Sequence, residues 1–138
     1  MTTATATTQN HPHSIGTVGA SSGTARARTA AIWILSVAAA GMFLMAGWGK
    51  LSGAPQMVGL YDAIGVGQWF RYLTGAIEVT AALALFVPSV AAFAAAALAA
   101  TMVGAIATHL FIVGGSVAIP VVLLAATSFI AWTRWSRR

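Results

Sequence analysis

Residues 74–86, TGAIEVTAALALF, form a run that is apolar enough to lie in lipid except for the carboxylate of Glu78. The composition of the whole chain agrees with this run: 59% of the 138 residues are hydrophobic, only 7% are charged, and the mean hydropathy is +0.85. About 25% of the residues of a soluble globular domain are charged. The composition therefore indicates an integral membrane protein.

Four apolar runs are separated by turn-forming residues, and each run is close to the ~20 residues that a helix needs to cross a bilayer. They cover about residues 29–51, 70–88, 89–113 and 115–133. Four segments are too few for a closed β-barrel, so helices are the only structure that satisfies the backbone in lipid. We predict an all-α fold, an integral membrane four-helix bundle, with a four-transmembrane-helix domain over residues 29–138.

The segment before the first run, residues 1–28, is rich in Thr, Ser, Ala and Gly. It has no long apolar stretch, so it cannot bury enough surface to offset the entropy lost on folding. We expect a disordered cytoplasmic tail and no metal site, although His11 and His13 lie in it. The chain has no cysteine, which excludes disulfides, thiolate metal sites, CxxC redox centres and covalently attached haem.

The cations that flank the runs predict the orientation. An even number of spans places both termini on one side of the membrane, and that side holds Arg26, Arg28, Arg134, Arg137 and Arg138. Only Lys50 and Arg71 flank the runs on the opposite side. Because cytoplasmic loops are enriched in Lys and Arg, we predict cytoplasmic N- and C-termini in a multi-pass protein of the inner cell membrane. The net charge of +5 is thus a topology signal, and no nucleic-acid partner is expected.

The polar residues within the runs are predicted to gather in the outer half of the membrane. Glu78 follows Arg71 by two helical turns, or ~10 Å, near the same helix face. Lys50 ends the first run, and His109 lies about one turn before the end of the third. An isolated charged carboxylate in hydrocarbon costs several kcal/mol, so Glu78 should be protonated or face Lys50, Arg71 or His109. Two interpretations stay open: a structural pin between helices, or a site for a ligand or proton.

Three stretches of the chain resemble the DoxX-like family of four-helix membrane proteins: AAAGMFLMAGWGKLSGAP, YDAIGVGQWFRYLTGAIEVTAALALFVP and AAALAATMVGAIATHLF. The features in common are a G-x-x-K-L end to the first helix, a glutamate early in the second and A-x-x-x-H near the end of the third. The resemblance extends over about residues 30–130. It implies that Lys50 is the lysine of the first helix, Glu78 the glutamate of the second and His109 the histidine of the third. Val66 stands where family members often have proline.

The resemblance implies a membrane subunit of a quinone-linked or redox-stress oxidoreductase system, which is not an enzyme by itself. Such a subunit is expected to dock a protein partner or form a homo-oligomer. Glu78 and His109 are the predicted catalytic, proton-handling residues, and together with Lys50 and Arg71 they are the predicted ligand-binding residues for a quinone. Two alternatives remain: a small proton-coupled transporter in which Glu78 alternates between proton and substrate, and a membrane anchor with no ligand.

Overall fold

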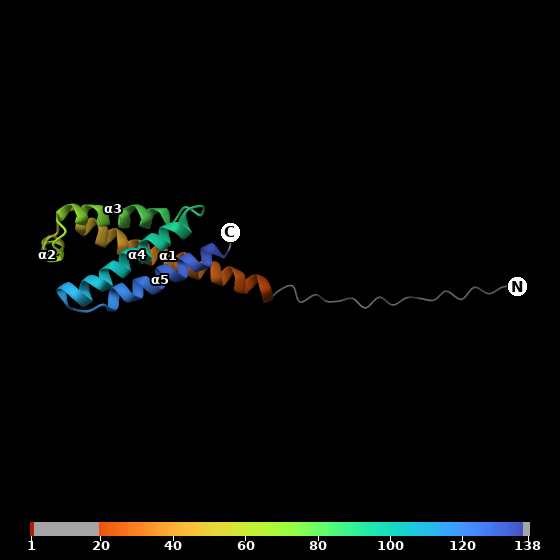
Figure 1. Ribbon diagram of the computed structural model, residues 1–138. Coiled ribbons are helices and arrows are strands. Elements are labelled where there is room, and N and C mark those ends of the chain that lie inside the picture. Colours follow the sequence, from red (N-terminus) through yellow and green to blue (C-terminus); the bar gives the residue numbers. More distant parts are fainter. Residues whose placement is uncertain (2–19, 137–138) are drawn as a thin grey trace.

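The computed structural model describes Met1 and residues 20–136, and within these residues it contains helices and no strand. The predicted all-α fold is therefore confirmed. The elements are α1 (Ala20–Leu51), α2 (Pro55–Ile64), α3 (Gln68–Ala84), α4 (Ala91–Thr108), the π-helical turn η1 (His109–Val113) and α5 (Ala118–Trp135) (Figure 1).

The first helix is longer than predicted. Residues 20–28, which we expected to be disordered, belong to α1, a helix of 32 residues. Adding a residue to an existing helix costs far less than starting one, and the Ala and Arg residues here have high helix propensity. The prediction of a disordered tail is thus wrong for residues 20–28. Residues 2–19, with His11 and His13, lie outside the described part of the chain.

The loop after α1 contains a short helix that the sequence analysis did not predict. α2 has Pro55 in its first turn, where its missing N–H removes no hydrogen bond, and it ends at Gly65, whose φ of 77° is left-handed. The second long helix, α3, runs from Gln68 to Ala84 rather than from 70 to 88. α3 ends at Ala84, whose carbonyl oxygen cannot accept an intrahelical hydrogen bond from Pro88 four residues later, because proline has no N–H.

Among the described residues, three helical segments are long and apolar enough to cross a membrane: Gly23–Leu51, Ala91–Val113 and Ala118–Trp135. α3 has 17 residues and contains the buried Arg71 and Glu78, and it packs along α1. The four predicted long segments are thus all helical, and α3 differs from the other three in being shorter and in burying charged side chains.

The long helices form two antiparallel pairs, α1 with α3 and α4 with α5, and the two pairs cross (Figure 1). The start of α1 and the end of α5 lie at one end of the bundle, which we call the terminal end; α2 lies at the opposite, α2 end. Small alanine side chains at the crossing let the helices approach closely. The buried core consists of Ala39, Ala40, Phe43, Ala81, Ala82, Leu85, Ala94, Ala95, Leu98, Met102 and Ile130.

Candidate functional site

Two glycines bring α1 and α3 into backbone contact near the α2 end. A Cβ atom on Gly47 would lie 2.8 Å from Val79 Cγ2 and 3.0 Å from the carbonyl oxygen of Gly75. A Cβ atom on Gly75 would lie 3.0 Å from Lys50 Cβ and 3.1 Å from the carbonyl oxygen of Gly47. Each glycine therefore makes room for the other helix, and the contact sets the register in which Lys50 and Glu78 face each other.

A buried ion pair links the two helices beside this contact. Lys50 Nζ donates to Glu78 Oε1 over 2.5 Å, and the side chains of the two residues are only 12% and 1% exposed. Helical side chains lean towards the N-terminus of their own helix, so the lysine stem passes Gly75 and directs its ammonium into the bundle. Of the three partners considered for Glu78, Lys50 is the one that contacts it.

The second oxygen of the same carboxylate has no such partner. Glu78 Oε2 is buried and accepts no hydrogen bond from any described residue. Most buried polar atoms in proteins have a partner, which is another protein group, an ordered water or a ligand. Oε2 is therefore the chemically open position of the site: it can accept a hydrogen bond from a ligand, or it can hold a proton.

Arg71 closes the end of α1 and does not bond to Glu78. Its side chain is buried, its Nη1 donates to the carbonyl oxygen of Lys50, and its Nε donates to Gln68 Oε1 over 2.6 Å. The guanidinium also lies 4.2 Å from the centroid of the Tyr72 ring. A cation is favourable here because the last carbonyls of a helix lack intrahelical donors and form the negative end of its dipole.

Polar contacts that the sequence analysis missed hold α2 over this site. Gln68 Nε2 donates to the carbonyl oxygen of Val58 over 3.0 Å and to Asp62 Oδ1 over 2.7 Å. The Tyr61 hydroxyl is 2.5 Å from the Thr74 hydroxyl. The only signal in the sequence was a set of polar residues around a glycine-rich turn, and such residues are also usual in loops.

His109 lies at the same end of the bundle but is held by its own helix. It begins η1, is half-buried, and its Nδ1 is 2.9 Å from the carbonyl oxygen of Ala105. α4 crosses the α1–α3 pair, so its last turns diverge from α3 and approach α2 (Figure 1). Among the described contacts of His109, none reaches Lys50 or Glu78. The described residues also contain no group of three His, Cys, Asp or Glu side chains that could hold a metal ion.

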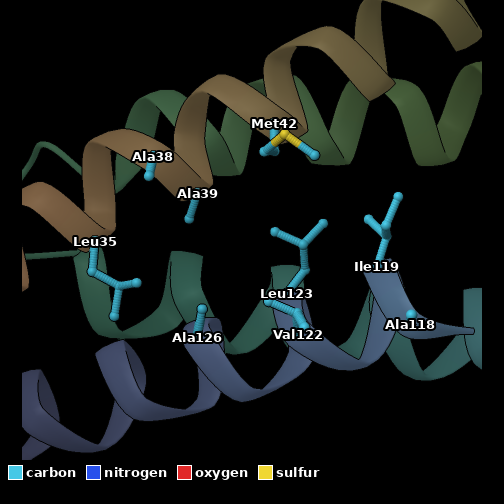
Figure 2. Close-up of a pocket in the computed structure, with 9 residues that line it drawn as sticks. All are labelled: Leu35, Ala38, Ala39, Met42, Ala118, Ile119, Val122, Leu123 and Ala126. Atoms are coloured by element: carbon cyan, nitrogen blue, oxygen red, sulfur yellow. The ribbon is translucent and has the colours of Figure 1, made fainter.

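Two apolar grooves lie between the helix pairs. One, of 370 Å³, separates α1 from α5 (Figure 2), and the other, of 450 Å³, separates α3 from α4. Lys50 and Glu78 line neither of these two grooves. The polar site and the apolar grooves are therefore separate features of the bundle.

Comparison with models of protein families matches residues 34–130 to the DoxX-like family. The matched region contains all four predicted site residues, Lys50, Arg71, Glu78 and His109, together with the glycine contact between α1 and α3. No match was found among curated proteins or among solved structures.

Proposed function

The chain belongs to the DoxX-like family, and from this and the geometry of the site we propose that it is the membrane subunit of a quinone-linked or redox-stress oxidoreductase system. In this proposal the chain docks a protein partner and binds a quinone next to the Lys50–Glu78 pair. The chain has no cysteine, so any thiol or cysteine-ligated redox centre of the system belongs to the partner.

The observation that supports this proposal is the buried, unpartnered Oε2 of Glu78. The hydroxyl of a reduced quinone is a hydrogen-bond donor of the kind that this oxygen lacks, and the Lys50 ammonium is a donor suited to a quinone carbonyl. A few polar groups in apolar surroundings are typical of sites for lipid-soluble ligands. These donor and acceptor groups support the proposal that a quinone head group binds here.

In the proposed mechanism, Glu78 accepts or releases a proton at Oε2. Lys50 holds the carboxylate through Oε1 and balances its charge when the proton has left. Arg71, Gln68 and Tyr61 keep α2 and the end of α1 together over the site. The quinone supplies the two-electron redox chemistry when it is bound. His109 stays a predicted proton-handling residue at the same end of the bundle.

The test separates proton handling from structural pairing. Glu78→Gln alone leaves the Lys50 ammonium without its counter-charge, which costs about 3–5 kcal/mol for a buried pair. The double variant Lys50→Met with Glu78→Gln removes both charges, and such neutral replacements often preserve stability. We expect the double variant to melt near the wild-type temperature in detergent. It should still lose at least about tenfold in quinone retained, because a hydrogen bond to a charged group is lost.

The measurements are the melting temperature, the quinone content of the purified protein by mass spectrometry of lipid extracts, and the quinone-reductase activity of membranes. Asp62→Asn is the matched control, because it makes the same carboxylate-to-amide change at the other acidic residue, which is exposed. A stable double variant that keeps full quinone content and activity would contradict the proposal and leave Lys50–Glu78 as a structural pin. His109→Gln, measured alongside, tests whether this residue serves the same site.

A further inference from the structure

The groove between α1 and α5 has the shape and chemistry of a site for a hydrocarbon chain. Figure 2 shows side chains of the two helices facing each other across it, with carbon atoms and the sulfur of Met42 as their only drawn atoms. Four of the nine lining residues are alanines, so the groove exists because small side chains leave space that larger ones would fill. The lining residues are Leu35, Ala38, Ala39, Met42, Ala118, Ile119, Val122, Leu123 and Ala126.

The groove has the dimensions and the chemistry that suit part of a hydrocarbon chain. Its α1 wall extends from Leu35 to Met42, which is about 10 Å at 1.5 Å per residue. Its volume is about 370 Å³ and all nine lining residues are apolar, so an occupant needs no hydrogen bonds there. A flexible acyl chain meets both conditions, and a helix from a second copy of the chain is the alternative that the test below distinguishes.

A fixed cation lies where the groove reaches the terminal end. Arg134, in the last turn of α5, donates from Nη2 to Ser36 Oγ over 3.3 Å, and its guanidinium lies 5.4 Å from the centroid of the Trp33 ring. Both partners belong to α1 and flank Leu35, the first residue of the groove wall. The arginine side chain leans back along α5, as helical side chains do, so its charge lies beside the end of the groove.

The charge of the terminal end favours an anion. The chain has only two acidic residues, Asp62 and Glu78, and both belong to the α2 side of the bundle, whereas Arg26 and Arg28 are exposed on the first turns of α1. Trp132 and Trp135 are also exposed near the end of α5, and such tryptophans lie at the level of lipid head groups. Basic pockets between membrane helices at this level are typical sites for anionic lipids.

We propose that the groove between α1 and α5 binds one acyl chain of an anionic phospholipid whose phosphate contacts Arg134. The acyl chain occupies the alanine-lined space, and the head group lies at the terminal end beside Trp33. This site is separate from the Lys50–Glu78 pair, which lies towards the other end of the bundle.

The proposal is tested by native mass spectrometry of the full chain released from nanodiscs that contain equal amounts of phosphatidylglycerol and phosphatidylcholine with the same acyl chains. The wild type should retain one phosphatidylglycerol in preference to phosphatidylcholine. Arg134→Gln should lower this preference about fivefold, because the proposed cation partner of the lipid phosphate is lost. Ala38→Leu and Ala126→Leu, which fill the groove, should lower the retention of both lipids.

Matched controls separate this site from general charge and packing effects. Arg28→Gln removes an exposed cation from the same end, and Ala97→Leu fills the groove between α3 and α4 instead. Both controls should keep the preference of the wild type. Arg134→Lys, which keeps the charge, serves if the glutamine variant does not fold.

Each of the following results would overturn the proposal. One is equal retention of the two lipids by the wild type, and another is a loss of preference in Arg28→Gln as large as that in Arg134→Gln. Unchanged lipid retention in the variants with a filled groove would also contradict it. A dimer mass that only these variants lose would assign the groove to a second copy.

Discussion

At the end of α1, Lys50 and Arg71 each bind a different negative group: the carboxylate of Glu78 and the carbonyl oxygen of Lys50. Long basic side chains near helix ends usually extend towards the membrane surface, where their charge stays hydrated. Lys50 does the opposite and directs its ammonium inward to Glu78, while Arg71, from α3, binds the carbonyl oxygen of Lys50. The planar guanidinium suits the divergent carbonyls of a helix end, and the single point charge of lysine suits one carboxylate oxygen.

Sequence reasoning could place these residues at one end of the bundle but could not pair them. Helical rise and run boundaries put Lys50, Arg71 and Glu78 within about two turns of one another. The choice between the two cations depends on the approach of α1 to α3, and the position of His109 depends on the crossing angle of α4. Neither quantity follows from the spacing of residues along one helix, so the sequence left three possible partners for Glu78, of which the structure pairs Lys50 with it.

We expect the titration of the Tyr61 phenol to lower the stability of the protein at alkaline pH. Burial raises the pKa of its phenol above the ordinary value of 10.0; the hydrogen bond with Thr74 and the Arg71 guanidinium oppose this rise, and the Glu78 carboxylate adds to it. The folded state therefore keeps the phenolic proton when the unfolded chain begins to lose it, so stability falls as the pH rises above about 10. At pH 8 the protonated phenol keeps its hydrogen bond, worth about 1 kcal/mol.

We therefore expect Tyr61→Phe to melt below the wild type at pH 8 and this difference to shrink as the pH rises from 9 to 11. The measurement is the melting temperature in detergent at each pH. Tyr72→Phe is the control, because this phenol is half exposed and the Arg71 guanidinium contacts its ring rather than its hydroxyl. A difference between Tyr61→Phe and the wild type that stays constant with pH would show that the phenol does not contribute to alkaline unfolding.

At the scale of elements, the contact of α1 with α3 is set by Gly47 and Gly75. We expect Gly47→Ala to force the helices apart, because its Cβ atom would meet Val79 and the backbone of Gly75. Overpacking of this kind costs about 1–3 kcal/mol. Gly41→Ala is the matched control, since it lies in the same helix and its Cβ atom would have no atom within 4 Å.

The melting temperatures of the two alanine variants in detergent provide the comparison. Gly41→Ala should equal or slightly exceed the wild type, because alanine favours a helix over glycine by up to about 1 kcal/mol. Gly47→Ala should melt several degrees lower. Equal melting temperatures for the two variants would show that the backbone contact can relax without cost.

The short helix α2 could not be predicted from its local sequence. It has ten residues, no side-chain cap at its start and a glycine at position 59. Isolated helices of fewer than about 12–15 residues are marginal in water. Its stability therefore comes from tertiary contacts, above all Gln68 with Val58 and Tyr61 with Thr74. The long apolar helices were predictable because their composition alone requires them in lipid.

At the scale of the whole molecule, the two crossed helix pairs explain why the bundle has apolar grooves. Each pair packs along its length, whereas the pairs meet in an alanine-rich core at the crossing. On either side of a crossing the helices diverge, and small side chains cannot fill the gap. The grooves between α1 and α5 and between α3 and α4 are the result.

The predicted orientation of this bundle in the membrane can be tested by cysteine labelling. The chain has no cysteine, so a single introduced cysteine is its only thiol. The start of α1 and the end of α5 lie at the same end of the molecule (Figure 1), and these helix segments contain Arg26, Arg28 and Arg134. Two exposed serines mark the opposite ends: Ser52 follows α1 at the α2 end, and Ser136 follows α5 at the terminal end. Single substitutions Ser52→Cys and Ser136→Cys therefore report the two sides separately.

If the positive-inside rule governs the chain, a maleimide that cannot cross membranes should label Ser52→Cys in intact cells. It should label Ser136→Cys only after the cells are permeabilised, and a fluorescent reporter that matures only in the cytoplasm should be bright when fused after Arg138. The reverse pattern would invert the orientation. Labelling of both positions from the same side would show that α3, α4 and α5, the long helices between Ser52 and Ser136, do not all span the membrane. A dark reporter after Arg138, with Ser52→Cys labelled from outside, would place Ser52 and the C-terminus on the same, outer side. The helix that then fails to span is expected to be α3, which is the shortest of the long helices and contains Arg71 and Glu78.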